Sequence, residues 1–286
     1  MILAAIGLAL AAAALHGTWN VLVKVSGDPL VTFYRATLVA AAVWTVPTVV
    51  AWVFLGRPAM SPSALGFACA SGVLEVTYLW LLSTAYSRGE LSVVYPIARG
   101  SAPLVAVVVG FGVLGERLTG LQFAGVVLLL GGILAVTLPQ TGGRATLPAL
   151  LTGVAIASYT AIDRVGVRLT EVWLYSWVLL VLMAVGMFTS VHIARRIRPS
   201  LKGPSSDPPP ITWRQGAVIG IIMWAGYVLV LFALSIAPLA VVAPVREVAI
   251  VAVAVWGVWK LKERRSATLK IAGAAATLVG VALLAI

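Results

Sequence analysis

Ten stretches of mostly apolar residues follow one another along this chain, and they constrain its fold more than any other feature. Each is close to the ~20 residues that an α-helix needs to cross a bilayer. They lie at residues 2–23, 30–55, 64–86, 91–114, 120–138, 146–165, 172–194, 215–236, 239–260 and 267–286. Because lipid offers the backbone no hydrogen-bond partner, such runs fold as helices. The sequence therefore predicts an all-α membrane protein with ten transmembrane helices.

The composition supports this class. Of the 286 residues, 61% are hydrophobic and 10% are charged, whereas soluble domains have about 25% charged residues. Most of the lysines and arginines that give the net charge of +11 lie between the apolar runs. This placement favours contacts with anionic lipid headgroups over contacts with nucleic acid. The single cysteine, Cys69, excludes an internal disulfide and a multi-cysteine metal site. We expect no metal and no cofactor. The first apolar run has no basic segment before it and indicates a membrane span, without a cleavable signal peptide.

The two halves of the chain repeat each other at an offset of 147 to 148 residues. Leu114-Gly115-Glu116-Arg117-Leu118 corresponds to Leu261-Lys262-Glu263-Arg264-Arg265, and Pro96 corresponds to Pro244. Because five spans per half is an odd number, the second half must enter the membrane from the opposite side. We therefore expect two inverted five-helix repeats, at residues 1–140 and 145–286. A Pro-rich stretch at residues 195–213 is predicted to be a flexible linker between the seventh and eighth helices.

Lysines and arginines predict the orientation. Four of them fall in the even-numbered connections, at Arg57, Arg117, Arg164 and Arg168. Fourteen fall on the opposite side, including the cluster from Arg195 to Lys202. Because cytoplasmic loops carry the excess of basic residues, both termini are expected outside the cytoplasm.

Two arginines lie inside predicted spans. Arg99 follows Pro96, and Arg246 follows Pro244 and precedes Glu247. An arginine at such a depth costs at least ~2.5 kcal/mol and usually faces a partner or a watery cavity. In one interpretation the three charged residues line a shared cavity that an anionic substrate neutralises, because the planar guanidinium group suits carboxylates and phosphates. In the other, Arg99 and Glu247 form a structural ion pair.

Other polar and aromatic residues at membrane depth complete the candidate site. Glu75 could carry a coupling proton or pair with an arginine. His16 could titrate near neutral pH or hydrogen-bond a neighbouring helix. We read Asp163 as an ion-pair partner of Arg164, and the glycines of spans five and ten as packing residues. The expected substrate-contacting residues besides the arginines are Tyr95, Trp19, Asn20, Tyr78, Tyr159, Trp224 and Tyr227.

The chain resembles ten-span EamA-type members of the drug/metabolite transporter superfamily. Three motifs carry this resemblance: Leu114-Gly115-Glu116-Arg117-Leu118, its partial copy Leu261-Lys262-Glu263-Arg264, and His16-Gly17-Thr18-Trp19-Asn20. The resemblance implies five-plus-five inverted repeats around a central cavity, and export or exchange of metabolites or xenobiotics. Many relatives have both ends in the cytoplasm, opposite to the charge bias of this chain.

These observations favour a secondary active transporter of a small organic metabolite, with a carboxylate or phosphate-type group, by alternating access. A proton-coupled exporter of cationic compounds, a flippase of a lipid-linked precursor and a scaffold without transport are the alternatives. Motifs of zinc hydrolases, serine hydrolases and phosphate loops are missing, so we expect no enzyme. The expected partners are the substrate, the lipid bilayer and protons, in a monomer or homodimer of a bacterial inner membrane.

Overall fold

The computed structural model describes residues 1–89, 91–137, 143–197, 211–249 and 267–285. Its regular elements are α-helices, which confirms the all-α class for these residues. In chain order they are α1 (Ile2–Val25), α2 (Pro29–Phe54), α3 (Pro62–Arg88), α4 (Leu91–Gly112), α5 (Gly120–Thr137), α6 (Thr146–Gly166), α7 (Val172–Ile197), α8 (Trp213–Ile236), α9 (Leu239–Arg246) and α11 (Ala267–Leu284).

Seven of the helices in the described ranges are long and apolar enough to cross a membrane, namely α1, α2, α3, α4, α6, α7 and α8. The other three, α5, α9 and α11, are shorter. Predicted span nine is described as the helix α9 to Arg246 and as a turn at residues 247–248, and its residues 250–260 lie outside the described part. The repeat copy at residues 261–265 and most of the linker at residues 195–213 also lie outside it. Residues 195–197 of that linker belong to α7.

Short polar side chains begin several of these helices. The Asp28 carboxylate accepts hydrogen bonds from the backbone N–H groups of Leu30 and Val31 at the start of α2. Thr212 and Gln215 form a reciprocal capping box at the start of α8. Both caps satisfy backbone donors that a helix leaves open at its first turn. These caps fix the starts of α2 and α8 within two residues of the predicted positions.

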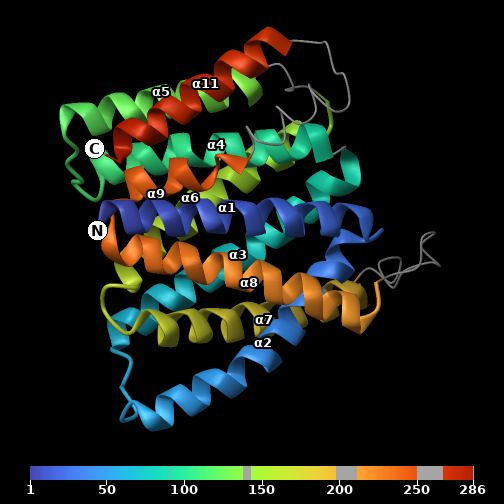
Figure 1. The fold of residues 1–286 in the computed structure, drawn as a ribbon. Coiled ribbons are helices and arrows are strands. Elements are labelled where there is room, and N and C mark those ends of the chain that lie inside the picture. Colours follow the sequence, from blue (N-terminus) through green and yellow to red (C-terminus); the bar gives the residue numbers. More distant parts are fainter. Residues whose placement is uncertain (90, 138–142, 198–210, 250–266, 286) are drawn as a thin grey trace.

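The helices form one bundle with their long axes roughly side by side (Figure 1). The α5–α11 pair lies at one edge and α2 lies at the other. Between them α1 contacts α8, α3 contacts α6, and α4 contacts both α6 and α9. Large apolar side chains on the outer helices are exposed, as lipid contact requires, for example at Val46, Val53 and Phe54 of α2. The molecule is a multi-pass membrane protein.

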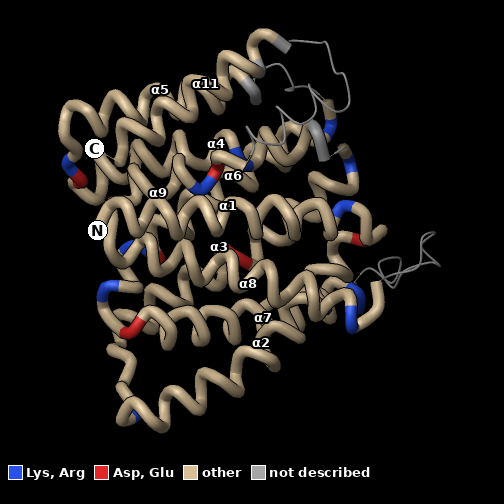
Figure 2. The backbone as a smooth tube through the Cα atoms, in the orientation of Figure 1, with Lys and Arg blue, Asp and Glu red and all other residues tan. Residues whose placement is uncertain are grey.

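Charged residues concentrate at the two ends of the bundle, with a small group near its middle (Figure 2). Both chain termini lie at the same end (Figure 1). The opposite end carries the basic residues that close α1, α3 and α7, at Lys24, Arg88, Arg195 and Arg196. This distribution is the one on which the predicted orientation depends.

Helices α5 and α11 pack against each other through glycines, which agrees with the packing role expected for these glycines. A Cβ atom added to Gly125 would lie 2.8 Å from the carbonyl oxygen of Gly280, and one added to Gly280 would lie 2.6 Å from that of Gly125. Gly132 faces the carbonyl of Gly273 and the hydroxyl of Thr277 in the same manner. Small residues are needed here because the two backbones approach more closely than any side chain allows.

We expect Gly132→Ala to lower the thermal unfolding temperature of the purified protein, because the added methyl group would overlap the backbone of α11. Overpacking of this kind costs about 1–3 kcal/mol. The neighbouring Gly131→Ala is the matched control, since a Cβ atom there meets nothing within 4 Å. It should be neutral or slightly stabilising, because alanine favours helix. Equal destabilisation by the two substitutions would contradict the assigned packing.

Candidate functional site

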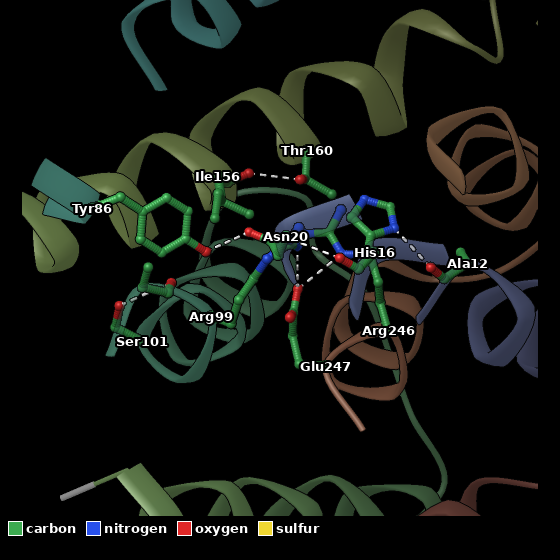
Figure 3. A network of polar contacts seen from close by, with 11 residues as sticks. Ala12, His16, Asn20, Tyr86, Arg99, Ser101, Ile156, Thr160, Arg246 and Glu247 are labelled. Carbon is green, nitrogen blue, oxygen red and sulfur yellow. Dashed lines mark hydrogen bonds and ion pairs between the residues drawn. The ribbon is translucent and has the colours of Figure 1, made fainter. Parts of the chain in front are cut away.

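Three buried charges from α4 and α9 meet inside the bundle. Arg99 Nη1 lies 3.1 Å from Glu247 Oε1, and Arg246 Nε lies 3.0 Å from the same oxygen. The three side chains are at most 3% exposed. Figure 3 shows the Glu247 carboxylate between the two guanidinium groups. The structure shows the predicted ion pair of Arg99 with Glu247, and Arg246 shares it. The interpretation with an anionic substrate stays a prediction.

A local break of the helix positions Glu247. Pro244 has no N–H, and α9 ends two residues later at Arg246. The next two backbone N–H groups bond to carbonyl oxygens three residues earlier, not four as in an α-helix. Glu247 N–H donates to Pro244 O, and Val248 N–H donates to Val245 O. This tighter turn brings adjacent residues Arg246 and Glu247 into contact, which a regular helix would not do.

The ion group leaves hydrogen-bonding capacity unused. Within the described part of the chain, Arg99 Nη2, Arg246 Nη1 and Trp19 Nε1 are buried without a hydrogen-bond partner. The Arg99 guanidinium also lies 5.9 Å from the centre of the Trp19 ring. Buried donors are normally paired, so three unpaired donors around one net positive charge suit an anion.

A small cavity lies next to Trp19, and its wall does not include Arg99, Arg246 or Glu247. Seven predicted site residues line it: His16, Trp19, Glu75, Tyr78, Tyr159, Trp224 and Tyr227. Leu79, Met183 and Met223 complete the wall. The volume open to water is about 30 Å³, which suffices for a few water molecules and not for a metabolite. The described conformation is therefore a closed one.

Aromatic rings connect the walls of this cavity. The ring centre of Tyr159 in α6 lies 5.6 Å from that of Tyr78 in α3 and 5.7 Å from that of Tyr227 in α8. Trp224 lies 5.6 Å from Tyr227. These edge-to-face and tilted pairs hold the three helices together at the level of the site.

The contacts of Asp163 differ from those we predicted. The predicted ion pair with Arg164 is wrong, because Arg164 Nε lies 3.3 Å from Glu116 Oε1 and Asp163 points into the bundle. Tyr175 Oη donates to Asp163 Oδ1 at 2.7 Å, and Tyr227 Oη donates to Asp163 Oδ2. Neighbours in a helix face different directions, so sequence adjacency was a poor guide here. The spacing of Asp163 from Tyr159 was the informative signal.

Glu75 lies close to the same group. It lies in the wall of the same cavity as Tyr227, and its electrostatic neighbours include Asp163 and Arg246. Sequence reasoning found Glu75 but did not identify Asp163 as its neighbour.

The remaining predicted residues lie around the ion group. His16 Nδ1 donates to the Ala12 carbonyl oxygen at 2.8 Å within its own helix. Asn20 donates to the His16 carbonyl oxygen and accepts a 2.6 Å bond from Tyr86 Oη, so it supports α1 and does not line the cavity. Tyr95 is buried in α4 next to Arg99.

Glu116 is a residue whose role sequence reasoning missed. It belongs to the Leu-Gly-Glu-Arg-Leu motif after α4, yet its carboxylate accepts from the backbone N–H groups of Leu239 at 2.6 Å and Ala240 at 2.9 Å. Glu116 thereby caps the first turn of α9 and, through Arg164, contacts the end of α6. The motif thus connects the first half of the chain to the helix that carries Arg246.

The fold and the apolar helices define a polytopic helical membrane protein. Residues 3–138 match the model of the EamA-like transporter family. The match confirms the resemblance to EamA-type drug/metabolite transporters and agrees with the expectation of a transporter rather than an enzyme.

Solved structures share the fold. Among 27 matching chains, one crystal structure of a protein covers 99% of this chain and 98% of its own, with a TM-score of 0.70. Its sequence identity is 17%, so this likeness concerns the fold alone. No curated protein matches the chain.

We expect Glu247→Gln to destabilise the protein strongly, by about 3–5 kcal/mol, because two buried guanidinium groups would lose the carboxylate with which both form ion pairs. The double variant Arg246→Gln/Glu247→Gln leaves a single buried cation and should be more stable than Glu247→Gln alone. Thermal unfolding of the purified variants measures both. Additive losses in the double variant would show that the two charges do not interact.

Proposed function

We propose that the protein is a secondary active transporter of a small organic anion with a carboxylate or phosphate-type group. The observation that carries this proposal is the trio of unpaired buried donors at Arg99, Arg246 and Trp19. Two cations and one carboxylate leave a formal charge of +1 at this place, and an anion would neutralise it. A guanidinium edge binds planar carboxylates and phosphates with two parallel hydrogen bonds.

Alternating access fits the closed cavity. The ion group and the cavity lie between helices of the first and second halves, α1, α3 and α4 on one side and α6, α8 and α9 on the other. A metabolite enters only if the halves move apart. We propose that they rock against each other and expose the site to the two sides of the membrane in turn.

The proposed ten spans and inverted repeats receive support from paired contacts. At an offset of 148 residues, Gly125 corresponds to Gly273 and Gly132 to Gly280, and the observed contacts are Gly125 with Gly280 and Gly132 with Gly273. The helices pair in the same reciprocal way. The first helix of each half packs on the third helix of the other half, α1 on α8 and α6 on α3. Such reciprocal pairs are what a two-fold axis in the membrane plane produces.

A cationic substrate is the second candidate. Its support is the aromatic wall of Trp19, Tyr78, Tyr159 and Trp224 around Glu75, since aromatic faces attract organic cations. The two candidates differ in which ligands stabilise the protein.

We expect anions to stabilise the purified protein in a thermal-shift screen of benzoate, lactate, glycerol phosphate, betaine and tetraphenylphosphonium. A ligand present at 100 times its dissociation constant adds about 2.7 kcal/mol. Arg99→Lys keeps the charge but loses the planar fork, so anion affinity should fall roughly tenfold or more.

The exposed Arg168→Lys is the matched control for this loss and should bind the anion like the wild type. Stabilisation by the cation alone would overturn the anion proposal and favour the second candidate.

The proposed orientation places both termini outside the cytoplasm of a bacterial inner membrane, because basic residues crowd the opposite end of the bundle. A reporter fused after Ile286 should be active as a periplasmic enzyme and inactive as a cytoplasmic one. The reverse pattern would place the termini inside and would show that the charge bias does not determine the topology of this chain.

A further inference from the structure

A groove with a volume of about 460 Å³ lies between the end of α1 and the start of α8. These two helices pack against each other and run in opposite directions (Figure 1). The groove lies at the end of the bundle away from the chain termini, where Lys24 and Arg88 close α1 and α3. It shares no residue with the cavity of the candidate site, so it is a separate feature of the molecule.

The lining of the groove changes from apolar to polar along both helices. In α1, Ser26 lies one turn beyond Leu22, and in α8, Arg214 lies one turn before Val218. Because the two helices are antiparallel, both changes run toward the same end of the bundle. The apolar side chains therefore lie deeper in the membrane and the polar ones nearer to water. A phospholipid presents its acyl chains and its headgroup in the same order.

An aromatic contact marks the depth of the polar end of the groove. The exposed ring of Trp213 lies beside Arg35 of α2, with the guanidinium carbon 5.2 Å from the ring centre. Arg35 Nη1 also donates to the carbonyl oxygen of Ile211, which lines the groove. Tryptophan collects at the boundary between membrane and water. The start of α8 therefore lies at the level of the lipid headgroups.

Arg214 is the basic side chain of this groove that is available to a ligand. Lys24, close by in α1, has internal partners, because its Nζ donates to the carbonyl oxygens of Tyr86 at 2.9 Å and Gly89 at 2.8 Å. Within the described ranges Arg214 is exposed, lines the groove and forms no hydrogen bond or ion pair. None of the described lining residues is acidic, so the charge of the groove is positive.

We propose that this groove binds one anionic phospholipid, with the phosphate at Arg214 and an acyl chain along Leu22 and Val218. The charge of Arg214 selects an anionic headgroup, since a basic side chain near the membrane surface attracts such lipids. The apolar part of the groove distinguishes a lipid from a free phosphate ester, which has no chain to bury. Because α1 belongs to the first half of the chain and α8 to the second, the bound lipid contacts both halves.

Native mass spectrometry of the detergent-purified protein tests the proposal, with dioleoylphosphatidylglycerol and dioleoylphosphatidylcholine as the probes. The wild type should bind the anionic phosphatidylglycerol more tightly. Arg214→Gln should weaken that binding about fivefold, as expected for the loss of one basic residue beside an anionic headgroup. Val218→Trp keeps Arg214 but fills the apolar part of the groove, and it should also weaken binding of phosphatidylglycerol.

Arg144→Gln is the matched control for Arg214→Gln. Arg144 is exposed and lies at the same end of the bundle, because a Cβ atom added to Gly89 would lie 2.7 Å from the Cβ of Ala145. It does not line the groove, so Arg144→Gln should bind phosphatidylglycerol like the wild type. Equal affinity of the wild type for the two lipids would overturn the proposal. Equal losses in the two arginine variants would also overturn it, since the attraction would then belong to the whole basic end.

Two further measurements separate the groove from other sites for phosphate groups. Glycerol phosphate should not displace phosphatidylglycerol, and displacement would overturn the lipid as the ligand in favour of a soluble phosphate ester. Arg99→Lys, which alters the proposed substrate site, should leave the affinity for phosphatidylglycerol unchanged. A loss in that variant would overturn the assignment to the groove and would place the lipid at the buried arginines.

Discussion

The shared carboxylate of Glu247 is the interaction on which the interior of this protein depends. Two guanidinium groups at membrane depth are tolerable only because one oxygen lies about 3 Å from both. The helix break after Pro244 places that oxygen at one end of α9, and the first turn at the other end of this short helix is capped from outside. Glu116 supplies the cap from the other half of the chain. The polar site and the contact between halves are therefore one connected structure.

The positions of the helices could be predicted because apolar length is set by the bilayer. The end of α9 could not be predicted, because the effect of a proline on a helix depends on the helices packed around it. Pro96 and Pro103 lie inside the continuous helix α4, whereas α9 ends two residues after Pro244. Sequence alone does not distinguish these cases, because neighbouring helices decide whether the freed backbone groups find new partners.

The candidate site was predictable as a set of residues but not as a set of contacts. The rarity of charge in apolar spans pointed to Arg99, Arg246, Glu247 and Glu75, and seven of the predicted residues line one cavity. Asp163 was assigned to its sequence neighbour, whereas its partners Tyr175 and Tyr227 come from two other helices. Such partners are set by the packing of helices against one another, and the periodicity of a single sequence carries no information on that packing.

The numbering of the central ion pair has a consequence for the proposed repeat. Arg99 and Glu247 are 148 residues apart, which is the offset of that repeat, so the proposal makes each the counterpart of the other. Two identical halves related by the proposed two-fold axis would bring this position against its own copy, so that arginine would face arginine or glutamate would face glutamate. The attraction observed here therefore depends on the two halves carrying different residues at this one place.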